Sequence, residues 1–155
     1  MADVTDLQPY SANEKGLVDV LVDFKETLPN PIVFKVVGYQ AVAFENVTQG
    51  DALYSRASDG KVGKARANGT LDEATVAGFA ETTKSAGQSV RAIVSGQVAS
   101  SQTLDAGDIF FLSNTTPGQI IKTPPTTAGH FITLVGEAAN TNELIVRIKH
   151  PIALG

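Results

Sequence analysis

Two histidines, His130 and His150, are the only candidates in the sequence for the base of a hydrolytic triad. Such a triad needs a Ser or Thr nucleophile, a histidine that activates it, and a carboxylate that orients the histidine. His130 follows Gly129 at the start of a predicted strand, His150 precedes Pro151, and neither lies in a known nucleophile motif. We therefore interpret both histidines as structural or surface residues.

The acidic side chains are dispersed, and the closest groups are Asp72-Glu73 and the pair Asp105 and Asp108. Both groups are typical of turns and helix starts, where side-chain oxygens accept bonds from backbone N–H groups. A small glycan hydrolase would need two carboxylates that converge across the fold, and a calcium site at Asp105 and Asp108 is a further alternative. We expect no catalytic, cofactor-binding or metal-binding residues. If the protein were an enzyme, the candidate catalytic residues would be Asp51, Asp72, Asp105 and Asp108, and their substitution by alanine should abolish its activity.

The composition argues against several other classes of protein. The 12 Lys and Arg residues are outnumbered by 16 Asp and Glu residues, so the net charge of −4 gives no positive field for nucleic acid. The absence of Cys removes disulfides and thiolate sites, and it fits synthesis in a reducing cytoplasm. No glycine-rich phosphate loop, secretion signal or membrane-length apolar run is present. We predict a protein that is not an enzyme and has neither nucleic acid nor membrane as its partner.

The pattern divides the chain into an N-terminal arm and extension, residues 1–45, and a β-rich module, residues 46–155. Apolar residues at helical spacing predict a helix over residues 12–28, and Pro29-Asn30-Pro31 would end it. A strand around residues 18–24 is the alternative, because valines also alternate there. After the prolines, two apolar runs separated by Gly38 predict strands within residues 32–44 that join the main sheet: Ile32-Val33-Phe34-Lys35-Val36-Val37 and Gln40-Ala41-Val42-Ala43-Phe44.

Short apolar runs and turn signals alternate along the rest of the chain. This punctuation favours a sandwich or barrel over βαβ units, so we predict a mainly β, single β-sandwich or barrel-like domain with an N-terminal arm that carries one short helix. Ile109-Phe110-Phe111-Leu112 is apolar on both sides and should be a central strand or lie under a neighbouring subunit. Two other runs alternate and should bury one face each: Val90, Ala92 and Val94, and Leu144, Val146 and Ile148.

From Gln49 onward, the order of the segments resembles a β-module found widely in virion proteins of tailed bacteriophages. The resemblance covers roughly the last two-thirds of the chain and rests on that order, because each piece alone is common. The segments are Gly50-Asp51-Ala52-Leu53-Tyr54, Asp59-Gly60-Lys61-Val62, Val76-Ala77-Gly78-Phe79-Ala80, Gly87-Gln88-Ser89-Val90, Leu104-Asp105-Ala106-Gly107-Asp108, Thr116-Pro117-Gly118 and Glu143-Leu144-Ile145-Val146.

The resemblance implies a capsid decoration protein, also called a cement or head-stabilisation protein. Its partners would be the major capsid protein and further copies of itself in a homotrimer, and its location would be the capsid surface of the virion.

The alternative is a tail-fibre or baseplate adsorption module that binds a host surface glycan. Aromatic residues make up only 6% of the chain and Trp is absent, which disfavours that alternative. Tyr10, Tyr39 and Tyr54 could anchor an interface, although a position at the edge of the core explains them as well.

Overall fold

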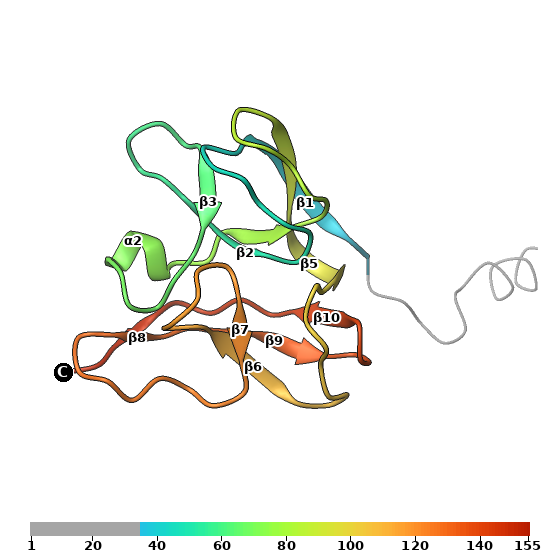
Figure 1. Cartoon of the computed structure of the whole chain (residues 1–155). Helices are drawn as coiled ribbons and strands as arrows, with labels where there is room; N and C mark the ends of the chain where they lie inside the picture. Colours follow the sequence, from blue (N-terminus) through green and yellow to red (C-terminus); the bar gives the residue numbers. More distant parts are fainter. Residues whose placement is uncertain (1–34) are drawn as a thin grey trace, which may run out of the picture. The chain divides into compact units, whose positions relative to one another are not determined.

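The computed structural model describes residues 35–155 (Figure 1). The predicted mainly β fold is confirmed: one antiparallel sheet curls into a half-barrel, and a two-stranded ladder accompanies it. Residues 1–34 of the predicted arm and extension, which include the predicted helix and Tyr10, lie outside the described residues. The elements are β1 (Val37–Val42), β2 (Ala52–Ser55), β3 (Val62–Lys64), α2 (Leu71–Ala74), β4 (Gly78–Ala80), β5 (Ser89–Ala99), β6 (Ile109–Leu112), β7 (Ile120–Ile121), β8 (Phe131–Ile132), β9 (Leu134–Ala138), β10 (Glu143–Val146) and β11 (Ile152–Ala153).

The long strand β5 joins the two halves of the nine-stranded sheet, whose order is β3-β2-β4-β5-β10-β9-β6-β7 with β1 also paired to β5. Its residues 89–95 pair with β1, and residues 96–99 pair with β10. Phe79 and Ala80 of β4 pair with the first part of β5 as well. Beyond β1, Ala43 forms a parallel bridge to β3, so β1 to β5 nearly close on themselves. Figure 1 shows this curled half above the half formed by β6, β7, β9 and β10.

Two apolar clusters lie on opposite sides of the sheet where β2, β4 and β5 run together. Consecutive buried residues on β5, Ala92 and Ile93, belong to different clusters, and the same holds for neighbouring residues on β2 and β4. Neighbouring residues of a strand point to opposite faces, so this part of the sheet is buried on both sides. The small cluster contains Ala43, Val47, Leu53, Val62, Ala80, Val90 and Ala92. The main cluster includes Ala52, Phe79, Ile93, Leu104, Phe110, Leu112, Val135 and Leu144.

The double coverage of β5 changes the predicted burial pattern of that strand. Val90 and Ala92 are buried as predicted, but Val94 is only half-buried. Ile93, which the alternating pattern would place on the wetter face, is buried because the main cluster covers that face. The other alternating run holds: Leu144 and Val146 are buried, and Ile148 packs against the main cluster.

Strand β6 is also less enclosed than its sequence predicts. It lies between β7 and β9, and Phe110 and Leu112 point into the main cluster. Ile109 is 51% exposed and Phe111 is half-buried, because the described residues leave the other face of this strand uncovered. The prediction of a central strand is confirmed for its pairing, since β6 has a neighbour on each edge, but the described residues do not cover both of its faces. Burial under a neighbouring subunit stays a prediction.

The apolar runs predicted within residues 32–44 form one described strand, β1, rather than two separated by Gly38. Gly38 lies inside the strand, where an added Cβ would sit 2.6 Å from the carbonyl oxygen of Ala92. Glycine is needed there because the two backbones approach closely. Residues 37–43 join the same sheet as β5, and Ala43 lies in the small cluster, so these residues pack with the module that follows them.

Truncation of Ile93 tests the double burial of β5. Ile93→Ala should lower the free energy of unfolding by about 2–5 kcal/mol, because it opens a cavity in the main cluster. The same change at Ile109, which is 51% exposed, should cost about 0.5 kcal/mol or less. Urea denaturation of both variants measures the difference, and equal losses would contradict burial of Ile93 between two packed layers.

Candidate functional site

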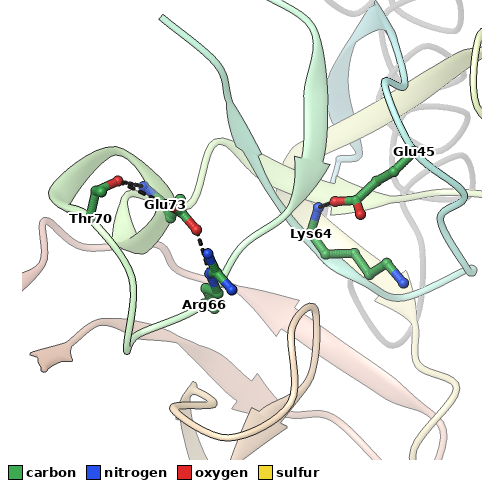
Figure 2. A network of polar contacts seen from close by, with 5 residues as sticks. All are labelled: Glu45, Lys64, Arg66, Thr70 and Glu73. Carbon is green, nitrogen blue, oxygen red and sulfur yellow. Dashed lines mark hydrogen bonds and ion pairs between the residues drawn. The ribbon is translucent and has the colours of Figure 1, made fainter.

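A partly enclosed hollow among the described residues lies beside β2 and β3. Its volume is about 210 Å³, below the roughly 300–1,000 Å³ of ordinary small-molecule sites. Acidic, basic and aromatic side chains share its wall, and Figure 2 shows how the charged ones lie. The lining residues are Phe44, Glu45, Tyr54, Lys64, Arg66, Glu73 and Pro117.

One side of this pocket is held by the short helix α2. Thr70 caps the helix by accepting a hydrogen bond from the backbone N of Glu73 at 3.3 Å, and its hydroxyl donates to Oε2 of Glu73 at 3.2 Å. The other carboxylate oxygen, Oε1, forms an ion pair with Nε of Arg66 (Figure 2). The backbone N of Arg66 also donates to the carbonyl oxygen of Glu73 at 2.9 Å. The Glu73 carboxylate therefore fastens α2 to the chain after β3.

The opposite side of the pocket is held by Glu45. Its Oε2 accepts a hydrogen bond from the backbone N of Lys64 at 2.8 Å. Phe44 lies directly over Gly63, where an added Cβ would overlap the ring and come within 2.6 Å of the Glu45 carboxylate. Phe44 also meets Tyr54 edge to face, with ring centroids 5.9 Å apart. These contacts need the small residue at position 63, because the ring occupies the space of a side chain.

Charged neighbours set the ionisation of this region. Burial raises the pKa of the Tyr54 hydroxyl, and the charges of Glu73 and Glu45 raise it further. Burial is the largest single effect on Glu73 and raises its pKa, but the hydrogen bond and charge of Arg66 together with the hydrogen bonds at Thr70 outweigh burial, so the pKa is lowered. In the turn between β2 and β3, Arg56 bonds to Asp59 at 2.6 Å and stacks 4.2 Å from the centre of the Phe44 ring. That bond lowers the pKa of Asp59 to about 2.

The two carboxylates that line the pocket make structural contacts. A general acid or base needs a proton that it can exchange with a substrate and a pKa near the working pH. Both pocket carboxylates already accept protein hydrogen bonds, and the pKa of Glu73 is shifted downward, away from neutral pH. Their hydrogen bonds and the ion pair connect the segment after β1 and helix α2 to β3 and the residues that follow it.

The two candidate histidines, His130 and His150, have different surroundings. Nδ1 of His130 lies 3.1 Å from the amide nitrogen of Asn114, and the backbone of His130 pairs with Leu154 of the C-terminal segment. His150 lines a shallow hollow with Thr75, Val76, Ile148 and Lys149. In the described part of the chain, neither imidazole has a hydrogen bond to a carboxylate or to a Ser or Thr hydroxyl.

The candidate aspartates are in three places. Asp51 is 5% exposed at the start of β2, its Oδ2 accepts from the backbone N of Thr48 at 2.8 Å, and burial raises its pKa. Asp72 lies in the first turn of α2, as the helix-start interpretation expects. Asp105 and Asp108 form a turn, and Nζ of Lys122 lies 2.7 Å and 3.2 Å from their carboxylates. The Lys122 ammonium thus takes the place that a cation would occupy.

Across residues 35–155, no three His, Cys, Asp or Glu side chains gather in a way that could hold a metal ion. In the same part of the chain, no helix has the length and apolar character needed to cross a membrane. Comparison of the sequence with models of known protein families and with curated proteins finds no match.

Sequence reasoning missed the pocket itself. Glu45 and Lys64 are 19 residues apart, and Arg66 and Glu73 are separated by seven, so no local motif connects them. One signal was available: Thr70 and Glu73 have the spacing of a capping box, which predicts a helix start.

The Arg56–Asp59 pair gives a titration test. Asp59 should titrate with a pKa of about 2 by NMR, and Arg56→Gln should move it toward 3.8, because the bond that favours the carboxylate is lost. Since the folded pKa lies below the unfolded one, the stability from this pair is present above pH 3.8 and lost as pH falls through about 2. Arg147→Gln, which removes an arginine paired with Glu137, is the charge-matched control and should leave Asp59 unchanged. An equal shift in both variants would point to a general charge effect.

Gly63→Ala tests the close contact under Phe44. The added methyl group should destabilise the fold by about 1–3 kcal/mol, because ring and backbone must move apart. In the double variant with Phe44→Ala, the loss should be smaller than the sum of the two single losses, since the clash with the ring is gone. Thermal denaturation of the three variants provides the measurement, and strict additivity would rule out the contact as the cause.

Proposed function

We propose that this protein is a structural virion protein that binds the outer surface of a phage capsid and cements neighbouring capsomers. The observation that carries the proposal is the distribution of exposed apolar side chains. On and beside β1, four apolar residues are 38–42% exposed, and Ile109 on β6 is 51% exposed. The four are Val36, Val37, Tyr39 and Val42. Exposed apolar residues on strands are typical of surfaces that contact other proteins.

The charged side chains support a binding role over a chemical one. Pairs such as Arg56–Asp59, Arg91–Glu81 and Arg147–Glu137 neutralise one another at the surface of the module. A surface with paired charges and exposed apolar strands can dock against protein without a strong electrostatic requirement. The order of segments that resembles the phage β-module points to the capsid as the partner.

Repetition explains how modest contacts would stabilise a shell. Each copy would add a weak contact between capsomers, and copies that form a homotrimer would engage several sites together, which raises the overall affinity. Binding to the mature lattice in preference to the unexpanded one would stabilise the mature lattice by mass action. The protein would be made in the host cytoplasm and reside on the capsid surface of the virion, with the major capsid protein as its partner.

The copy number in purified virions is the first test. Quantitative mass spectrometry relative to the major capsid protein should give a ratio near one copy per capsid subunit. A handful of copies per particle would move the protein to the tail and favour the glycan-binding adsorption module, which a glycan array can then examine. Absence from particles would overturn the virion assignment.

Capsid robustness provides a second readout. Mature particles assembled without the protein should release their DNA at lower temperature, and added purified protein should restore resistance, because bound copies bridge capsomers. Unexpanded capsids are the control and should gain little. Particles equally robust with and without the protein would contradict the cementing role.

A further inference from the structure

Two surface turns place a glycine directly after a residue with a side-chain carbonyl group, and the structure holds the two turns differently. They are Asp59-Gly60, between β2 and β3, and Asn68-Gly69, between β3 and α2. In such a pair, the backbone nitrogen of the glycine can attack the side-chain carbon of the preceding residue, because glycine has no Cβ to hinder the approach. Asparagine is among the residues that are chemically least stable on heating.

The Asp59-Gly60 turn is protected at both reacting groups. The backbone N of Gly60 donates a hydrogen bond to the carbonyl oxygen of Arg56 at 2.8 Å. The Asp59 carboxylate accepts from Nη2 and Nε of Arg56 at 2.6 and 3.1 Å, and from the backbone N of Lys61 at 3.1 Å. These bonds lower the pKa of Asp59 to about 2 and keep it ionised. An ionised carboxylate resists attack by a nucleophile because it already carries negative charge.

The Asn68-Gly69 turn has neither protection. Across residues 35–155, no hydrogen-bond partner is present for the backbone N of Gly69 or for the carboxamide of Asn68. Asn68 is exposed, so water reaches its side chain. Both reacting groups are therefore free to approach each other.

The other described asparagines are less favourable sites. Three of them have bonded carboxamides: Asn46 accepts from a backbone N at 2.9 Å, Asn114 bonds to a histidine ring at 3.1 Å, and Asn140 accepts from a backbone N at 2.8 Å. The fourth, Asn142, precedes Glu143, whose side chain hinders attack by its backbone nitrogen. Asn68 is also the one asparagine in the chain that precedes a glycine.

Packing explains why a glycine follows Asn68. A Cβ at Gly69 would lie 2.7 Å from Oε1 of Glu73 and 3.0 Å from Nε of Arg66. The ion pair that holds α2 therefore occupies the space that a side chain at position 69 would need. The contact that favours glycine here also leaves Asn68 without a bulky neighbour to protect it.

We propose that Asn68 is a site of spontaneous deamidation. The backbone nitrogen of Gly69 bonds to the side-chain carbon of Asn68 and gives up its proton, while the C–N bond of the carboxamide breaks. Ammonia leaves with that proton, and a cyclic succinimide forms. Water then opens the ring at either of its two carbonyl carbons, which gives aspartate or isoaspartate. The overall change exchanges ammonia for water and needs no oxidant, reductant or enzyme.

Isoaspartate would lengthen the main chain within a turn whose two ends are fixed. At one end, the backbone N of Ala67 donates to Ser113 at 2.9 Å, and its carbonyl oxygen accepts from Phe131 at 2.8 Å. At the other end, Thr70 caps α2. The added main-chain atom lies between these points, so the cap of α2 must shift. Aspartate keeps the original length and adds only a negative charge. The modification does not rest on the capsid assignment.

Peptide mass spectrometry of the aged, folded full chain tests the site. After incubation at mildly alkaline pH in water enriched in heavy oxygen, the peptide that contains Asn68 should carry the amide-to-acid mass change and the heavy oxygen. Isoaspartate should accompany aspartate there and form several-fold faster than at Asp59. The control is Asn68→Gln, whose longer side chain closes a ring less readily and should stay unmodified.

Three results would overturn the proposal. Asn68 could stay intact in the folded chain over a time in which the urea-unfolded chain is modified, which would mean that the folded turn prevents ring closure. Aspartate without isoaspartate would exclude the succinimide. Equal rates at Asp59 and Asn68 in the folded chain would show that the hydrogen bonds of the Asp59 turn give no protection.

Thermal denaturation separates the two products. The isoaspartate form, isolated from aged protein by chromatography, should melt at a lower temperature than the Asn68→Asp variant, which carries the same charge on a main chain of normal length. Asn68→Asp should melt close to the original chain. Equal melting temperatures for the isoaspartate form and Asn68→Asp would contradict the shift of the α2 cap.

Discussion

The close backbone packing around β5 is the constraint on which the rest of the fold depends. This strand is paired along one part with β1 and β4 and along the other with β10. Glycines on both neighbours make this possible: a Cβ at Gly38 would meet the oxygen of Ala92 at 2.6 Å, and one at Gly78 would meet the Cβ of Ala92 at 3.0 Å. Because β5 is held on both edges and both faces, it fixes where the curled half ends and where the other half begins.

The polar side chains around the pocket hold the neighbouring loops in fixed positions against the sheet. Glu45 and Glu73 tie the segment after β1 and helix α2 to the C-terminal end of β3 and the residues that follow it. Charges used in this way stabilise connections between elements. Exposed apolar side chains lie on and beside β1, at Ile109 of β6, at Leu71 of α2 and at Ile152 of β11. The module thus separates its polar residues, which hold loops, from its apolar strands, which can make contacts.

The sequence allowed the mainly β class, many of the turns and the alternation in β10 to be predicted, since these follow from local patterns. The turn at Asp105 and Asp108 and the helix start at Asp72 were also predicted locally. Burial of Ile93 could not be predicted, because it depends on a second layer that covers β5 from distant segments. The pocket could not be predicted for the same reason, because Glu45 contacts Lys64 only when the sheet is curled. Contacts between distant residues leave no periodic signal in a single sequence.

The carboxamide of Gln102 has a consequence for the size that an assembly can reach. By bonding to both backbone groups of Ile120, it occupies the far end of the sheet as a strand residue would. At β3, the Glu45 carboxylate occupies one backbone group, the N–H of Lys64. Within residues 35–155, the two end strands of the nine-stranded sheet therefore offer fewer free backbone groups to a strand of another molecule. Caps of this kind disfavour growth of the sheet from one copy to the next at these two ends when copies are crowded together.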